Sequence, residues 1–159
     1  AKRAARTASQ GIIDSYIHLG GKVGVMVEVN CETDFVARNE EFKAFVRDIC
    51  LQVAATNPTY LTRKDVPAEV LEEEKDILKK QAIRENKPEK IIDKIVSGRI
   101  EKYYKENCLL EQAFIKDQDI SITELLNGKI AQMGENMVIR RFIRFEMGEG
   151  LEKVDSCSS

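Results

Sequence analysis

Several common kinds of functional site are missing from this sequence. It has cysteines at positions 31, 50, 108 and 157 but no Cys-x-x-Cys pair, and His18 is its single histidine. The usual spacings of a zinc site are therefore absent. Cys31, Cys50 and Cys108 lie in apolar stretches and are expected to be small buried residues, which suits a reducing compartment. Cys157, on a polar tail, is the candidate for a reactive thiol.

The sequence also lacks a long apolar run and an excess of charge of one sign. No segment approaches the roughly 18 apolar residues of a membrane-spanning helix, and residues 1–6 contain no apolar part of a signal peptide. Charged residues make up 33% of the chain, yet the formal net charge is only -2. No overall field therefore favours nucleic acid or an anionic membrane. We expect a soluble, intracellular protein.

Catalytic motifs are missing as well. There is no Gly-x-x-x-x-Gly-Lys-Ser/Thr loop to hold nucleotide phosphates and no Gly-x-Ser-x-Gly nucleophile motif. His18 has no adjacent nucleophile and is interpreted as a surface residue. Glu32 and Asp34 form a carboxylate pair of a kind that can do acid–base chemistry, but no recognisable pocket surrounds them. The sequence therefore predicts no enzyme, no cofactor and no metal.

What the sequence does contain is a strong strand pattern. Valines alternate with polar residues over 22–31, the period of a strand with one buried face. Residues 12–19 also alternate, and Gly20-Gly21 between the two segments predicts a β-hairpin. A third strand is predicted over 136–147. One face of that strand is expected to carry Met137, Ile139, Ile143, Phe145 and Met147.

The other side of the predicted sheet mixes charged and apolar residues. The charged side chains expected there on the third strand are Arg140, Arg144 and Glu146. Together with Arg141 these arginines could form a nucleic-acid patch, but a solvated face or ion pairs are the commoner outcome. Val138 and Phe142 share this side, and Tyr16 and Met26 lie on the polar sides of their strands. The outer surface is therefore expected to be partly apolar and to need a cover.

Helical patterns fill most of the remaining chain. Apolar residues three and four apart predict helices over 39–55, 67–85, 89–107 and 121–133. Ser121 and Glu124 predict a capping box, and 109–116 is expected to be an extended connector. Gly98 marks either close packing or a tolerated glycine. The predicted fold is α+β: a three-stranded antiparallel sheet packed with helices, with a helical hairpin inserted between its second and third strands.

The polar segment after the second strand is the candidate functional site. It places Glu32, Thr33 and Asp34 beside the ring of Phe35, and Asn39 suits a helix start shortly afterwards. A loop held between two regular elements can present side chains to a partner. The alternative interpretation is structural: Phe35 packs under the next helix as a staple, and Asp34 or Thr33 caps a short helical turn.

Two separated segments carry a recognisable family pattern. The first is Glu28-Val29-Asn30-Cys31-Glu32-Thr33-Asp34-Phe35-Val36-Ala37-Arg38. The second comprises Cys108-Leu109-Leu110-Glu111-Gln112, Gly134-Glu135-Asn136, Arg140-Arg141-Phe142-Ile143-Arg144-Phe145-Glu146 and Gly148-Glu149-Gly150. Together they resemble the elongation factor Ts family, the nucleotide-exchange factors of the GTPase EF-Tu. The resemblance spans almost the whole chain.

This resemblance implies a function and a site. It implies an exchange factor that binds EF-Tu·GDP and promotes GDP release by disturbing the Mg²⁺ and phosphate site, with Phe35 as a wedge and Asp34 as a competing acid. The residues that would shape and support the loop are Glu32, Thr33, Val36, Ala37 and Arg38. The alternative is a non-catalytic interaction module, associated with the ribosome or EF-Tu, that keeps the fold without exchange activity.

The resemblance also implies an organisation. Residues 1–10, rich in Ala and Arg, would end a helix from an N-terminal domain that this sequence lacks; 11–152 would be a core and dimerisation domain, and 153–159 a flexible tail. The short form implies a homodimer through the sheet. The expected partners are thus EF-Tu and a second copy, without directly bound nucleotide, nucleic acid or membrane. The expected location is the bacterial cytoplasm, with plastid stroma or mitochondrial matrix as alternatives.

Overall fold

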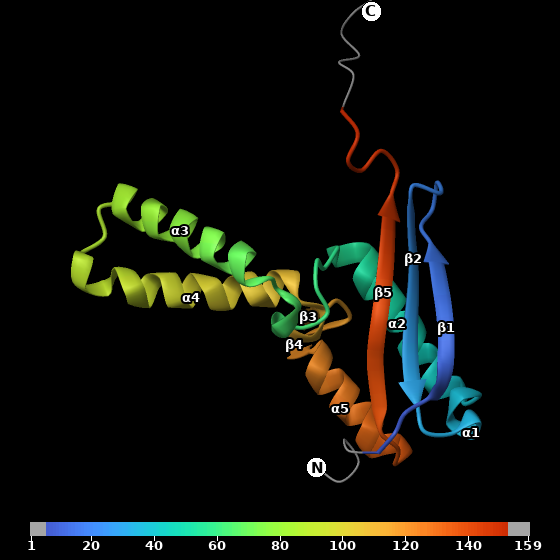
Figure 1. The fold of residues 1–159 in the computed structure, drawn as a ribbon. Coiled ribbons are helices and arrows are strands. Elements are labelled where there is room, and N and C mark those ends of the chain that lie inside the picture. The colour runs from blue at the N-terminus through green and yellow to red at the C-terminus, as the bar shows by residue number, and fades with distance from the viewer. Residues whose placement is uncertain (1–5, 153–159) are drawn as a thin grey trace, which may run out of the picture. The chain divides into compact units, whose positions relative to one another are not determined.

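The structure, a computed structural model, describes residues 6–152 (Figure 1). These residues divide into two units, one within 1–56 and 129–159 and the other over 57–128. The helix predicted to end at Gly11 falls partly on residues 1–5, which lie outside the described residues. Within 6–10 the structure has no helix, and Gln10 already begins a strand. The tail with Cys157 also lies outside the described residues.

The first unit is organised around a three-stranded antiparallel sheet. Its strands are β1 (Gln10–Ile17), β2 (Val23–Cys31) and β5 (Met137–Glu146), in the order β1-β2-β5. The predicted hairpin is confirmed: the His18 amide donates to the Val23 carbonyl over 2.9 Å, and Gly20 and Gly21 take positive φ angles in the connection. β2 is therefore the central strand, hydrogen-bonded along both edges.

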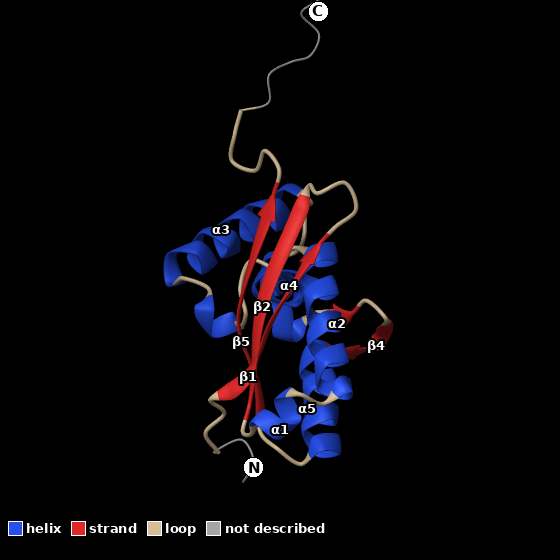
Figure 2. Cartoon of the chain, turned by 90° about the vertical axis from the view of Figure 1, so that its right-hand side faces the viewer, coloured by secondary structure: helices blue, strands red, loops and turns tan. Residues whose placement is uncertain are grey.

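The predicted valine face of β2 is buried under a helix. Val25, Val27 and Val29 are almost fully inaccessible, and α2 (Glu40–Thr56) lies along this face (Figures 1 and 2). The buried apolar stripe of α2 is the predicted one, Phe42, Phe45, Val46, Ile49, Cys50 and Val53. The Asn39 side chain accepts a hydrogen bond from the Glu41 amide over 2.7 Å, which starts the helix as expected. This packing fixes where β2 ends and α2 begins.

A β-bulge in β5 alters the predicted arrangement of the third strand. Val29 of β2 pairs with Ile139, which is buried as predicted, but the preceding residue Glu28 pairs with Arg141. Arg140 is thus an additional residue between two partners. Because side chains alternate along a strand, one additional residue moves every later side chain to the opposite face.

The predicted faces of β5 are therefore wrong beyond the bulge. Three residues expected to share the face of Ile139 are exposed, namely Ile143, Phe145 and Met147. Phe142 instead pairs with Val27 and so takes the helix side. Arg144 also turns to that side, where its guanidinium donates to the Ala54 carbonyl of α2 over 3.2 Å.

The outer face of the sheet, opposite α2, is partly apolar as predicted, but with partly different residues. Met26 and Val138 lie on it as expected, whereas Tyr16 and Phe142 pair with buried valines and lie on the helix side. We call the exposed apolar residues of this side the outer face: Ile13, Ile17, Met26, Val138, Ile143 and Phe145.

The second unit contains the predicted helical hairpin. This unit comprises η1 (Arg63–Asp65), α3 (Ala68–Arg84), α4 (Glu89–Asn107), η2 (Leu109–Glu111), β3 (Ala113–Phe114), β4 (Asp117–Ser121) and the start of α5 (Ile122–Met133). α3 and α4 pair side by side (Figure 1). The capping box of α5 is confirmed, because Ser121 and Glu124 exchange hydrogen bonds between side chain and backbone. The connector predicted over 109–116 is instead a 3₁₀ turn followed by a small β-hairpin.

Arg63 holds the base of this helical hairpin together. Its guanidinium donates to Glu101 over 2.9 Å and to Glu111 over 2.5 Å, and it stacks 4.3 Å from the centre of the Tyr104 ring. The hydrogen bonds from Arg63 lower the pKa of the Glu101 carboxyl. Beside it lies a small buried cluster that includes Tyr104 and Cys108. One cation therefore connects α4 to both 3₁₀ turns.

Two glycines allow a direct test of the packing. Gly11 in β1 has φ +142°, and a Cβ atom there would lie 2.1 Å from the Val29 carbonyl oxygen. Gly11→Ala is therefore expected to lower the free energy of unfolding by about 2–3 kcal/mol.

At Gly98 in α4 an added Cβ meets no described atom within 4 Å, which supports the tolerated glycine over close packing. Gly98→Ala should raise stability by about 0.5–1 kcal/mol. Denaturant unfolding followed by circular dichroism measures both, and equal effects would contradict this packing.

Candidate functional site

The segment between β2 and α2 contains a single helical turn, α1 (Asp34–Ala37). Thr33 is its cap: its backbone is extended, and its hydroxyl accepts a hydrogen bond from the Val36 amide over 3.2 Å. The predicted alternative that Thr33 caps a short helical turn is thus confirmed. The loop is a defined structure of its own between strand and helix.

Phe35 points away from the protein. Its side chain is 83% exposed, whereas Val36 and Ala37 are buried. Successive residues of a helical turn are rotated by about 100°, so a turn that buries the second and third of these residues directs the first outward. The interpretation of Phe35 as a staple under α2 is therefore wrong. An exposed phenylalanine on a capped turn is available to a partner.

Asp34 and Arg38 flank the Phe35 ring. The Asp34 carboxylate and the Arg38 guanidinium form an ion pair of 2.5 Å, with 57% and 80% of their side chains exposed. Asp34, Phe35, Arg38 and Asn39 line a shallow hollow of about 430 Å³. Because exposed ion pairs contribute little to folding, a partner's donor can replace Arg38 at small cost. Three predicted site residues, Asp34, Phe35 and Arg38, thus form one accessible surface.

Two of the remaining predicted residues, Glu32 and Thr33, face a segment from the far end of the chain, and the third, Val36, is buried. One oxygen of the Glu135 carboxylate accepts from the amides of Glu32 and Thr33, each over 3.1 Å, and the other accepts from the Thr33 hydroxyl over 2.7 Å. In return the Glu32 carboxylate accepts from the Asn136 amide over 2.7 Å. We call this set of contacts the carboxylate clasp. The sequence signal for Glu135 was its place in the second family segment, but nothing local connected it to this loop.

The thiols and the histidine of the described residues do not form a reactive site. Burial raises the pKa of the Cys31 and Cys108 thiols to about 11 and that of Cys50 to about 12, so these three are protonated at neutral pH. His18 is exposed and contacts the Tyr16 hydroxyl, as expected of a surface residue. Among residues 6–152 no three His, Cys, Asp or Glu side chains gather to hold a metal.

The arginines of β5 form ion pairs. Arg140 and Arg141 both donate to Glu28, over 3.1 and 2.7 Å, and Arg144 donates to Glu146 over 3.0 Å. Hydrogen bonds from Arg141 and Arg140 lower the pKa of the Glu28 carboxyl. The ion-pair alternative for these residues is confirmed.

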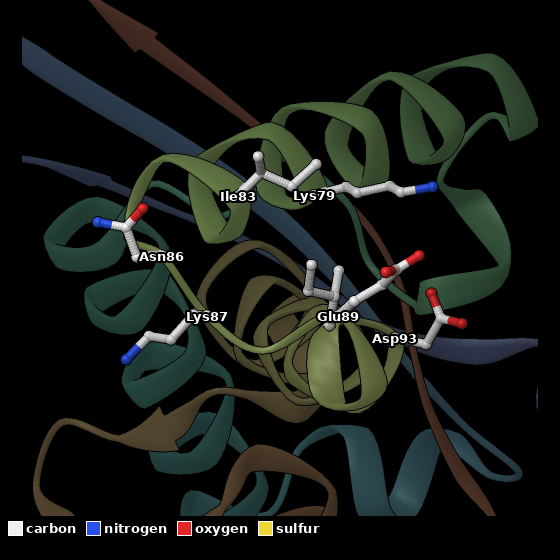
Figure 3. A pocket seen from close by; sticks show the side chains of 7 residues that line it. Lys79, Ile83, Asn86, Lys87, Glu89 and Asp93 are labelled. Atoms are coloured by element: carbon white, nitrogen blue, oxygen red, sulfur yellow. The ribbon is translucent and has the colours of Figure 1, made fainter.

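A second hollow, of about 660 Å³, lies at the closed end of the α3–α4 hairpin (Figure 3). It is lined by Lys79, Ile83, Asn86, Lys87, Glu89, Ile92 and Asp93. This lining offers amines, carboxylates and an amide but no serine, threonine, cysteine or histidine, and it includes none of the predicted site residues. The loop around Phe35 is therefore the candidate site.

Within the described chain, no helix has the length and hydropathy needed to cross a bilayer.

Comparison with known proteins agrees with the two sequence segments. A family model described as elongation factor TS matches residues 1–149. The elongation factor Ts of Thermoanaerobacter sp. (strain X514) is 61% identical over 152 residues, which is 96% of this chain and 74% of that protein. That of Syntrophomonas wolfei is 62% identical over 157 residues, 99% of this chain and 73% of that protein. On this similarity, the chain belongs to the elongation factor Ts family.

Proposed function

We propose that this protein binds EF-Tu·GDP and accelerates the release of GDP, and that the loop around Asp34 and Phe35 carries this activity. Membership of the family makes it a nucleotide-exchange factor of translation elongation. The observation that carries the assignment to this loop is the Phe35 ring, 83% exposed on a turn that is held at both ends. The site of action is thus a surface rather than a pocket.

Exchange of this kind requires differential binding. A GTPase holds GDP through contacts to its phosphates and through Mg²⁺. If an exchange protein binds the nucleotide-free GTPase more tightly than the GDP-bound form by a given ratio, it weakens GDP binding by the same ratio, because the coupling is reciprocal. No covalent bond is made or broken in this process. We therefore propose that the protein is not an enzyme with chemistry of its own.

The loop supplies the two groups that such a mechanism needs. Phe35 is exposed and contributes little to the stability of the chain. Its apolar surface can therefore be buried in the partner, which favours binding by about 1.5–3 kcal/mol. Inserted between elements of the GTPase, the ring displaces groups that position Mg²⁺. The Asp34 carboxylate, held only by an exposed pair with Arg38, competes for hydrogen-bond donors there. This arrangement favours exchange over a module that has kept only the fold.

We further propose that a second copy of the chain covers the outer face of the sheet. Six apolar side chains are exposed on this face, and such surfaces on soluble proteins usually mark an interface. A two-fold axis would pack the same patch of both copies together. Residues 11–152 would then serve as core and dimerisation domain.

The relatives named above are bacterial, which supports action in the bacterial cytoplasm. We propose that this chain binds no nucleotide, nucleic acid or membrane directly.

The exchange proposal is tested with Phe35→Ala and Asp34→Ala. Phe35→Ala should slow release of a fluorescent GDP from EF-Tu by about 10- to 100-fold, the effect of losing about 1.5–3 kcal/mol of burial. Stability should change by less than about 0.5 kcal/mol, because the ring is exposed. Ile91→Ala, which shortens another exposed apolar side chain, is the control and should exchange at the parental rate. A folded Phe35→Ala variant that is fully active would refute this role of the loop.

The dimer proposal is tested with Ile143→Lys, which places a charge on the outer face. Analytical ultracentrifugation should show two chains for the parent and one for this variant, because a buried unpaired lysine disfavours the packed sheets. Ile83→Lys, at an exposed isoleucine of α3, is the matched control and should leave the mass unchanged. A monomeric parent would rule out the second copy as the cover.

A further inference from the structure

The position of the Phe35 ring depends on how a very short helix is held. α1 has only four residues, Asp34–Ala37, and a single turn is not stable by itself in water. Phe35 faces solvent and cannot anchor the turn. Its anchors are therefore the burial of Val36 and Ala37 and the contacts of Glu32 and Thr33 at the start of the loop.

Most of the contacts at the start come from one side chain. Glu135 accepts three hydrogen bonds, from the amides of Glu32 and Thr33 and from the Thr33 hydroxyl. Hydrogen bonds to an ionised carboxylate are about twice as strong as those between neutral groups. The same hydroxyl caps α1 through the Val36 amide, so Glu135 also orients the cap.

The other end of the loop is tied to the same region of the chain. Gln132, in the last turn of α5, donates to the Glu41 carboxylate in the first turn of α2. Gly134 then ends α5 with φ +75°, immediately before Glu135. The end of α5 thus contacts both flanks of the segment that presents Phe35.

Building on the proposed function, we propose that Glu135 is a positioning residue for nucleotide exchange. It lies outside the hollow formed by Asp34, Phe35, Arg38 and Asn39, and acts through Thr33. By ordering the turn before the partner arrives, it removes the entropic cost of ordering the loop on binding. Its loss should therefore weaken exchange even though Phe35 and Asp34 are intact.

The clasp can be probed without EF-Tu because the sequence contains no tryptophan. Phe35→Trp places the single tryptophan of the chain on the loop, and its time-resolved anisotropy, excited at wavelengths where the four tyrosines do not absorb, reports local motion. In this background Glu135→Ala should at least double the amplitude of the fast anisotropy decay. Glu135→Gln keeps two acceptor sites on its oxygen and can donate to the Thr33 hydroxyl, so it should restore most of the order. Ser121→Ala, which removes the α5 cap at a distance in sequence, is the control for general destabilisation and should not change the anisotropy.

The same Glu135 variants, with Phe35 in place, are then compared in GDP release from EF-Tu. Glu135→Ala should lower the maximal rate about tenfold, with Glu135→Gln close to the parent and Ser121→Ala unchanged. Should Glu135→Ala fail to fold, Thr33→Val, which loses the hydroxyl shared by clasp and cap, takes its place.

Two results would overturn the inference. Unchanged anisotropy in Glu135→Ala would show that Glu135 does not order the loop. A mobile loop with parental exchange would show that the order has no role in exchange. Failure of the proposed function is distinguishable from both, because then Phe35→Ala exchanges like the parent while the anisotropy result still stands or falls separately.

Discussion

The central position of β2 is the constraint on which the first unit depends. β2 is hydrogen-bonded to β1 on one edge and β5 on the other, and its valines are buried against α2. A strand held on both edges and one face cannot shift by one residue without moving every valine into water. The end of β2 and the start of α2 are therefore fixed, and the short loop between them has a defined place to present its side chains.

The bulge at Arg140 determines the character of the opposite face. If Arg140 were a regular strand residue instead of a bulge, Ile143 and Phe145 would point to α2, and Phe142 and Arg144 to solvent. With it, Arg144 reaches the Ala54 carbonyl and the two apolar side chains are exposed. Glu28 accepts hydrogen bonds from both Arg140 and Arg141 at the same position, so the distortion is accompanied by favourable charge pairing. The bulge thus adds Ile143 and Phe145 to the apolar outer face for which we propose a second copy.

We propose that the candidate site works through shape and order rather than through reactive groups. The nearest thiol, Cys31, is buried and donates to the Thr33 carbonyl, and the carboxylates of Glu32 and Asp34 make separate contacts. An exposed ring on a turn of four residues would be mobile if only its own helix held it. The carboxylate clasp gives a physical reason for its order and connects the two sequence segments that carry the family pattern.

The sequence by itself determined the local elements of this protein. The valine alternation, the apolar stripe of α2, the α3–α4 hairpin and the Ser121 capping box were predictable because each depends on residues only a few positions apart. The elongation factor Ts segments likewise indicated where to look for the site. Only the tertiary structure decided the faces of β5, the outward direction of Phe35 and the contacts of Glu135 with the loop. A bulge depends on the partner strand, and the contact between Glu135 and Glu32 joins residues 103 positions apart, so no local pattern records either.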